Sequence, residues 1–199
     1  MNRPELILAS ASPRRRELIG QLGIPFRVEV PAIDESPRDG EAPHDHTRRL
    51  AVDKAAKVAL RYPDQWVLGA DTTVVVDGLM LGKPADEAEA FAMLRRISGR
   101  WHVVVTGFCL LHRAAERSFV DSVASEVFIR PLSDAQLRAY IATGEPMDKA
   151  GAYAIQDIGA GLVQQVRGSY TNVVGLPLAE VAILWERIHG ENVLIGGGS

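Results

Sequence analysis

The sequence predicts an α/β protein with a mixed sheet, and three observations lead to this prediction. Short apolar runs of strand character alternate with segments whose apolar residues recur at helical spacing. The pair Asp77-Gly78 is a strong hairpin signal, so antiparallel pairs interrupt a simple parallel series. The 199 residues are 47% hydrophobic and 24% charged, enough for one ordinary domain or two tightly fused lobes and too apolar for wholesale disorder.

The first two elements are predicted from their apolar residues and from the residues that typically begin and end a helix. Glu5–Ala9 is an apolar run that reads as a buried strand. A helix of two to three turns follows, because Ser12 is a good N-cap residue and Pro13 is favoured at the first helical position. Gly23 is expected to end this helix.

A long helix is expected after a second strand and an exposed loop. Pro25–Val30 has strand character, and residues 31–44 are rich in Pro, Asp, Glu and Gly, which is typical of a loop. The helix is predicted over Asp45–Tyr62 from one apolar stripe, which consists of Ala51, Ala55, Val58, Ala59 and Tyr62. The nearby histidines 44 and 46 fall in a polar segment, and we expect them to be solvated.

The alternation continues to the end of the chain. Trp66–Ala70 and Thr73–Val76 are predicted as two strands, with Asp71 at the carboxyl end of the first and a hairpin after the second. The remaining predicted elements are a strand at Leu79–Leu81, a helix at Asp86–Ile97, long β-rich stretches at His102–His112 and Ser118–Ile129, a helix at Ser133–Ala142, a glycine-punctuated, β-leaning region at Ala152–Val174 and a helix at Leu178–Ile188.

Composition argues against several classes of protein. The net charge of −3 lacks the basic excess that duplex DNA binding normally requires, so no nucleic-acid partner is expected. The single cysteine, Cys109, cannot form an internal disulfide, which favours a cytoplasmic location. No apolar run approaches the roughly 20 residues of a membrane span, and no export signal is expected. Residues 1–190 are predicted to form one domain, and residues 191–199 a flexible tail that is partly an added linker.

The first candidate site is the strand-to-helix turn at residues 10–16, SASPRRR. A helix N-terminus attracts anions through its free N–H groups and its dipole, and arginines in that first turn oppose the dipole unless an anion offsets them. Ser10, Ser12, Arg14 and Arg15 therefore read as a phosphate cradle. The alternative is an ordinary helix cap with solvated arginines.

The second candidate site is centred on Asp71, because ligands of open α/β sheets collect beyond the carboxyl ends of strands. Asp34 and Glu35 of the acidic loop add oxygen ligands, and magnesium is often held by one or two carboxylates plus substrate phosphates. Lys54 and Lys83 could each reach a polyphosphate. The alternatives are a turn aspartate at Asp71 and a lysine at position 54 that only extends along the apolar stripe.

These segments together resemble the Maf family of nucleoside triphosphate pyrophosphatases. The matching segments run in family order from residue 6 to about 188: LASASPRRRELI, IDES, RLAVDKA, LGADTTVVVDGLMLGKP, ISGRWHVVVTG, DKAGAYAIQDIGAG and GSYTNVVGLPL. The resemblance implies a two-lobed fold related to the inosine triphosphate pyrophosphatases, with a long central mixed sheet and a nucleotide cleft between the lobes. It also implies a homodimer.

The implied activity is cleavage of a nucleoside triphosphate between its α- and β-phosphates, with a divalent cation (Mg, Mn or Co). By resemblance, Asp71 accepts a proton from the attacking water, and Glu35 and Asp71 help to hold the metal. The phosphates are bound or neutralised, again by resemblance, by Ser10, Arg15, Lys54 and Lys83.

The subfamily implied by the resemblance is the dTTP/UTP branch. That branch carries Arg, Thr and Gln at three specificity positions, which match Arg14, Thr72 and Gln156 here. Asp157 replaces the glycine of many relatives, which bears on base preference. The alternatives are hydrolysis of CTP or modified pyrimidine nucleotides, and a non-catalytic nucleotide-binding regulator of septum formation or cell division.

Overall fold

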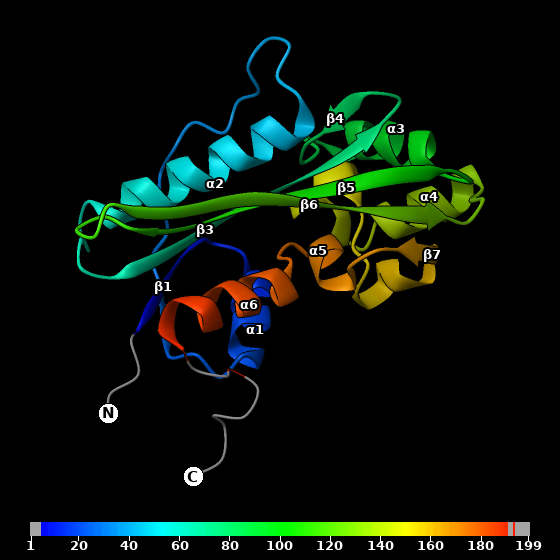
Figure 1. Ribbon diagram of the computed structural model, residues 1–199. Helices are drawn as coiled ribbons and strands as arrows, with labels where there is room; N and C mark the ends of the chain where they lie inside the picture. Colours follow the sequence, from blue (N-terminus) through cyan, green and yellow to red (C-terminus); the bar gives the residue numbers. More distant parts are fainter. Residues whose placement is uncertain (1–4, 191–192, 194–199) are drawn as a thin grey trace. The chain divides into compact units, whose positions relative to one another are not determined.

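We describe residues 5–190 and 193 in a computed structural model of the chain (Figure 1). The expected C-terminal tail, residues 191–199, lies outside the described residues apart from Val193. The chain divides into two compact units. Unit 1 contains Met1–Asp71, Thr106–Val123 and Gly175–Ser199, and unit 2 contains Thr72–Val105 and Ala124–Val174. Each unit is described by itself.

The predicted α/β fold with a mixed sheet is confirmed. The seven strands have the order β2-β1-β3-β5-β6-β7, with β4 paired to β3. The strand bounds are β1 Leu6–Ala9, β2 Phe26–Val28, β3 Trp66–Val76, β4 Leu79–Leu81, β5 Trp101–His112, β6 Arg117–Ile129 and β7 Val163–Arg167. β1 runs parallel to β2 and β3, whereas β4 is antiparallel to β3 and β7 to β6.

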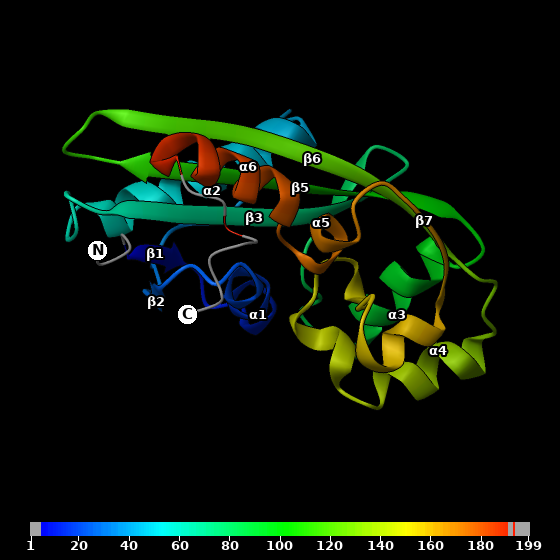
Figure 2. The same cartoon turned by 60° about the horizontal axis from the view of Figure 1, so that its bottom comes forward.

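Three helices belong to unit 1. They are α1 (Pro13–Gln21), α2 (Pro43–Ala59) and α6 (Leu178–His189). α2 lies on one face of the unit 1 strands, and α1 and α6 lie on the other face (Figures 1 and 2). Ala51, Ala55, Val58 and Ala59 of the predicted stripe are buried against β1 and β3 in a small core completed by Cys109 of β5. Tyr62, which the prediction included, lies beyond the end of α2 and is half-buried. Burial raises the pKa of the Cys109 thiol to about 12, which keeps it a neutral apolar side chain.

One sequence prediction about the sheet is wrong. The segments Trp66–Ala70 and Thr73–Val76 are not two strands, because β3 runs unbroken through all eleven residues of Trp66–Val76. Asp71 therefore lies inside the strand and not at its end. The β-branched residues that follow, from Thr72 to Val76, favour extended backbone and carry the strand past the carboxylate.

Unit 2 contains the predicted hairpin and two capped helices. Asp77 and Gly78 both have positive φ, 52° and 75°, the conformation of the two-residue turn that suits a twisted hairpin. The N-cap of α3 (Glu87–Ile97) is Asp86, which accepts a hydrogen bond from the Glu89 N–H. α4 (Asp134–Ile141) begins with a capping box formed by Ser133 and Gln136.

The prediction of a β-leaning region at Ala152–Val174 is largely wrong. This part of unit 2 holds short helical turns, and β7 is its one strand among the described residues. The turns are η3 (Asp157–Gly161) and α5 (Tyr170–Val174), and two further turns, η1 (Glu145–Asp148) and η2 (Ala150–Ala152), directly precede them. Apolar residues between glycines are compatible with short strands as well as with helical turns, so the local pattern does not separate the two outcomes. η1 and η2 pack on α3 and α4, and η3 packs on β7.

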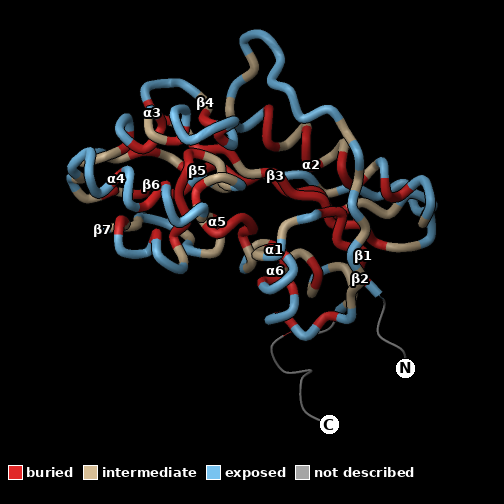
Figure 3. Tube along the Cα trace, turned by 180° about the vertical axis from the view of Figure 1, so that it is seen from behind, coloured by how far each residue is buried: buried red, intermediate tan, exposed pale blue. Residues whose placement is uncertain are grey.

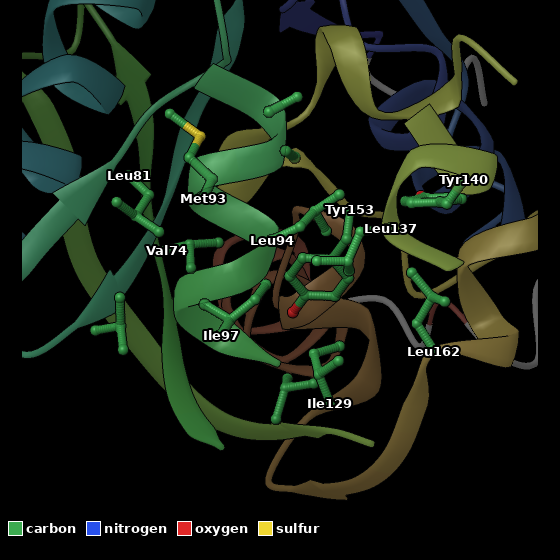
Figure 4. Packing of buried hydrophobic residues seen from close by; sticks show 14 of the residues in the cluster. Val74, Leu81, Met93, Leu94, Ile97, Ile129, Leu137, Tyr140, Tyr153 and Leu162 are labelled. Atoms are coloured by element: carbon green, nitrogen blue, oxygen red, sulfur yellow. The ribbon is translucent and has the colours of Figure 1, made fainter. Parts of the chain in front are cut away.

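The core of unit 2 lies between its sheet and these helices. Leu94 and Ile97 of α3, Ile129 of β6 and Leu137 of α4 are almost completely buried and pack around Tyr153 (Figure 4). Within this core, Nε2 of His102 lies 2.7 Å from the Tyr153 hydroxyl. Burial lowers the pKa of His102 to about 4, so the imidazole is neutral at pH 7.

Candidate active site

The N-terminus of α1 presents a buried arginine, Arg15. Ser12 caps the helix by accepting a hydrogen bond from the Arg15 N–H at 3.4 Å. The Arg15 side chain turns back toward the strand end, where its Nε donates to the Gly175 carbonyl at 2.7 Å. Its Nη1 donates to Oγ of Ser10 at 3.4 Å. These two hydrogen bonds help to fix the guanidinium.

The electrostatics around Arg15 point to nearby carboxylates. Burial lowers the pKa of the Arg15 guanidinium, and the charges of Asp71 and Glu35 partly offset that effect. α1 has no acidic residue in its first turn, so no side chain of the helix itself complements its N-terminal dipole. Arg14, beside it, is half-buried, and its charge adds to the positive potential there.

Asp71 and Lys54 form a buried ion pair in unit 1. Nζ of Lys54 donates to Oδ1 of Asp71 at 2.7 Å, and side-chain exposure is 7% for the lysine and 10% for the aspartate. Among the described residues, Lys54 is the one hydrogen-bond partner of this carboxylate. Each of these two buried side chains therefore has a partner of opposite charge beside it.

The pair forms because α2 packs directly on β3. A Cβ atom at Gly69 would lie 2.1 Å from the carbonyl oxygen of Ala51 and 2.9 Å from the nitrogen of Ala55. Gly107 of β5 is similarly close to Thr47 of α2. Asp71 is two residues beyond Gly69 and faces the same side of the strand, so this close approach brings it within reach of Lys54.

Glu35 joins this pair from the loop between β2 and α2. Its Oε1 lies 3.1 Å from Nζ of Lys54, and its side chain is 53% exposed. Residues 34–40 of the loop are all exposed, as Figure 3 shows above the start of α2. The carboxylates of Glu35 and Asp71 therefore share one ammonium, with Glu35 on the solvent side.

The same loop holds a second, buried polar network that the sequence analysis missed. Glu41 accepts hydrogen bonds from Nε and Nη2 of Arg49, at 2.5 and 2.8 Å, and its Oε2 lies 2.8 Å from Nδ1 of His46. The prediction that His46 is solvated is therefore wrong, whereas His44 is exposed as expected. The sequence does hold a signal for this network, because Arg49 and His46 lie on one predicted helix that follows an acidic loop. The apolar stripe of that helix drew attention away from these polar residues.

The other predicted site residues belong to unit 2. Thr72 directly follows Asp71 on β3, so it faces the opposite side of the strand. Lys83 is exposed and lies just after β4, and Gln156 is half-buried and precedes η3. The segment after Gln156 is fixed by Glu145, which accepts hydrogen bonds from the N–H groups of Ile158 and Gly159 at 3.1 and 2.9 Å.

Comparisons with known proteins identify the family. The model of the family described as "Maf-like protein" matches residues 5–188. The chain belongs to the Maf family. It is 52% identical to a dTTP/UTP pyrophosphatase of Geobacter metallireducens over 88% of this chain and 92% of that protein. It is 53% identical to a dTTP/UTP pyrophosphatase of Symbiobacterium thermophilum over 87% of this chain and 89% of that protein.

A solved structure shares the fold of this Maf chain. The HAM1 protein from Coxiella burnetii superposes with a TM-score of 0.50 at 15% identity, covering 92% of this chain and 99% of that one. At this identity the similarity concerns the fold alone. The resemblance drawn from the sequence motifs is confirmed at the level of the family and of the fold. None of the helices formed by residues 5–190 is long and apolar enough to cross a membrane.

Proposed function

We propose that this Maf protein is a nucleoside triphosphate pyrophosphatase that hydrolyses dTTP and UTP to the monophosphate and pyrophosphate. The observation that carries the proposal is the buried Lys54–Asp71 ion pair. Glu35 pairs with the same Lys54 ammonium, and the charges of Asp71 and Glu35 act on the Arg15 guanidinium. Two cationic and two anionic groups thus lie in unit 1. Hydrolysis of a polyphosphate requires cations that neutralise the phosphates and a carboxylate that accepts a proton from water. The names of the relatives in Geobacter and Symbiobacterium support the choice of substrate.

In this proposal the cations of unit 1 bind the phosphates. Arg15 and Ser10 stand at the N-terminus of α1, where unpaired backbone N–H groups add to the attraction for an anion. The Arg15 guanidinium is held in place by Gly175, so little reorganisation is needed when a phosphate arrives. Lys54 neutralises charge that develops on the phosphate oxygens, and the exposed Lys83 of unit 2 adds a second ammonium.

Asp71 has the role of general base. One of its carboxylate oxygens is held by Lys54, which fixes the orientation of the group and leaves the other oxygen to accept a proton from water. The oxygen of that water bonds to the α-phosphorus as the phosphoanhydride bond between the α- and β-phosphates breaks. The electron pair of the broken bond stays on the bridging oxygen, which leaves as part of pyrophosphate, and the proton of the water passes to Asp71.

A divalent cation fits the residues of this site. Glu35 and Asp71 both direct an oxygen at the Lys54 ammonium, so both already face one cationic position. Two carboxylates supplemented by substrate phosphates are a sufficient set for magnesium, manganese or cobalt, which prefer oxygen donors. When bound, the cation would supply neutralisation of phosphate charge. We propose that Glu35 and Asp71 are its protein ligands.

Base selection belongs, in this proposal, to Arg14, Thr72 and Gln156. The amide of Gln156 offers both a donor and an acceptor to the edge of a pyrimidine. Replacing Gln156 by Ala is expected to lower kcat/KM for dTTP more than for GTP, because a lost base contact discriminates between substrates. An unchanged ratio would remove Gln156 from base recognition.

We also propose that the protein is a cytoplasmic homodimer. The family resemblance favours the homodimer, and the single cysteine, Cys109, favours the cytoplasmic location. Light scattering coupled to gel filtration tests the dimer. A mass near twice 21.6 kDa supports it, and a mass near 21.6 kDa contradicts it.

The experiment that tests the function is a substrate panel. The purified protein is incubated with magnesium and each of dTTP, UTP, CTP, GTP, ATP and 7-methyl-GTP, and monophosphate and pyrophosphate are quantified. Preferential release of pyrophosphate from dTTP and UTP is expected. Release of pyrophosphate from 7-methyl-GTP alone would support the reaction and contradict the proposed substrates. No release from any nucleotide with magnesium, manganese or cobalt would favour the non-catalytic regulator.

A further inference from the structure

The loop that carries Glu35 has no regular structure of its own. Between β2 and α2 the backbone forms neither helix nor strand, and residues 34–40 are exposed. A free loop of this length would have many conformations, and bringing a carboxylate into one of them costs conformational entropy. Something outside the loop must therefore hold Glu35 beside Lys54.

Arg49 of α2 provides that attachment. Its guanidinium binds Glu41 through two nitrogens, at 2.5 and 2.8 Å, which is the bidentate geometry for which arginine is suited. The same Nη2 also donates to the carbonyl of Ser36, the residue next to Glu35, at 3.1 Å. One side chain thus joins the C-terminal end of the loop to the residue beside the proposed metal ligand.

The attachment is protected from water although the loop is not. Side-chain exposure is 15% for Arg49, 9% for Glu41 and 8% for His46. The Arg49 guanidinium, with His46 and the Arg38 N–H, holds the pKa of the Glu41 carboxyl well below its usual range. A carboxylate that is this little exposed, with both oxygens hydrogen-bonded, is a rigid anchor, unlike the more exposed Glu35 that it supports.

Arg49 and Lys54 lie five residues apart on the same helix. The loop is therefore tied to α2 at two points, by Arg49 through Ser36 and Glu41, and by Lys54 through Glu35 itself. When a phosphate attracts Lys54 away from Glu35, or a cation takes the place of the ammonium beside the carboxylate, the second tie is weakened and the first remains. The position of Glu35 then depends on Arg49.

We propose that Arg49 and Glu41 are positioning residues that hold the Glu35 carboxylate ready to bind the cation of the metal–nucleotide substrate. This inference rests on the proposed function, and adds to it two residues that do not themselves touch the substrate. Partners that orient metal ligands typically change metal affinity or activity by about 10- to 100-fold when they are lost. Arg49 supports Glu35 in this way through the loop backbone.

Two adjacent arginines of α2 provide a matched test. Arg49 binds the loop, whereas Arg48 pairs with Asp45 of the same helix at 2.7 Å, and that pair is exposed. We would measure Mn²⁺ binding by the electron paramagnetic resonance signal of free Mn²⁺, with an α,β-imido analogue of dTTP that is not hydrolysed. Arg49→Gln is expected to raise the Mn²⁺ Kd about 10-fold or more. Arg48→Gln should leave it near the wild-type value, because exposed pairs contribute little.

A double-mutant cycle separates positioning from general destabilisation. If Arg49 acts through Glu35, then Arg49→Gln should change Mn²⁺ affinity little when Glu35 is already replaced by Gln. Additive effects of the two substitutions would overturn the proposal, as would equal Mn²⁺ affinity of Arg49→Gln and Arg48→Gln. Glu41→Gln, which keeps the shape of the side chain, provides a second variant if Arg49→Gln does not fold, with the same expectations and the same refuting results.

Steady-state kinetics distinguish failure of this inference from failure of the proposed function. With dTTP, Arg49→Gln should raise the Mg²⁺ concentration needed for half-maximal rate, and kcat should recover at high Mg²⁺. A wild-type protein that hydrolyses dTTP, combined with variants of unchanged Mg²⁺ requirement, would overturn the positioning role alone. A wild-type protein that hydrolyses no nucleotide would overturn the proposed function itself.

Discussion

Replacing Gly69 by Ala tests whether the close packing of α2 on β3 is what aligns Lys54 with Asp71. The added Cβ would lie 2.1 Å from the carbonyl oxygen of Ala51, a backbone atom inside a helix that cannot rotate away. An ordinary carbon–oxygen contact is about 3.3 Å, so helix and strand must separate locally by about 1 Å. Gly69 is the contact point, and Lys54 and Asp71 lie on either side of the gap that would open.

The size of the effect follows from the ion-pair distance. Nζ of Lys54 and Oδ1 of Asp71 are 2.7 Å apart, so a separation of about 1 Å would take the pair beyond hydrogen-bonding range. Misplacement of a catalytic group by about 1 Å can cost about 100-fold in rate, and an overpacked core typically loses about 1–3 kcal/mol. We therefore expect Gly69→Ala to lower kcat for dTTP about 100-fold and the free energy of unfolding by about 2 kcal/mol.

The assay pairs kinetics with urea denaturation of the same preparations. Gly20→Ala is the matched control, since a Cβ there meets no atom within 4 Å and the residue lies inside helix α1. That variant should keep wild-type activity and gain about 0.5–1 kcal/mol of stability from the higher helix propensity of alanine. If Gly69→Ala hydrolysed dTTP at the rate of Gly20→Ala, the packing explanation for the alignment would be refuted.

Two further predictions concern stability in unit 2. His102 has a pKa of about 4 when folded against 6.5 when unfolded, so its contribution is intact above pH 6.5, and about 3 kcal/mol is lost as pH falls from 6.5 to 4. In denaturation curves at these two pH values, His102→Asn should lose less free energy of unfolding than the wild type as the pH falls. An equal loss in the two proteins would contradict the assignment. Asp157 has a left-handed backbone with φ of 53°, so Asp157→Gly should raise the free energy of unfolding by about 0.5–1 kcal/mol. A lower thermal midpoint for Asp157→Gly would show that the Asp157 side chain stabilises this turn.

Much of the fold can be predicted from local signals in the sequence. Ser12 is the N-cap of α1 as predicted, because capping depends on neighbouring backbone groups. Asp86 and Ser133 cap α3 and α4 in the same way. The hairpin at Asp77-Gly78 is equally local. Long strands and short helical turns are less predictable, since the unbroken β3 and the turns of 145–161 depend on packing partners distant in sequence.

The candidate site also contains residues that the sequence predicts and residues that it does not. Ser10, Arg15, Glu35, Lys54 and Asp71 were selected from the sequence, and the structure brings these five together in unit 1. The prediction that Asp71 ends a strand is wrong, because the residue lies within β3. Arg49 and Glu41 were missed, since a charged residue on an amphipathic helix looks solvated until the loop folded over it is known.

The most direct test of the central claim is the turnover of Asp71→Asn with dTTP and magnesium. The substitution keeps the size of the side chain and removes its ability to take a proton, while Glu35 still pairs with Lys54. We expect kcat to fall by at least about 100-fold, the scale for loss of a general base, with nucleotide binding measured by calorimetry retained. A folded variant that turns over dTTP at nearly the wild-type rate would contradict the role of Asp71.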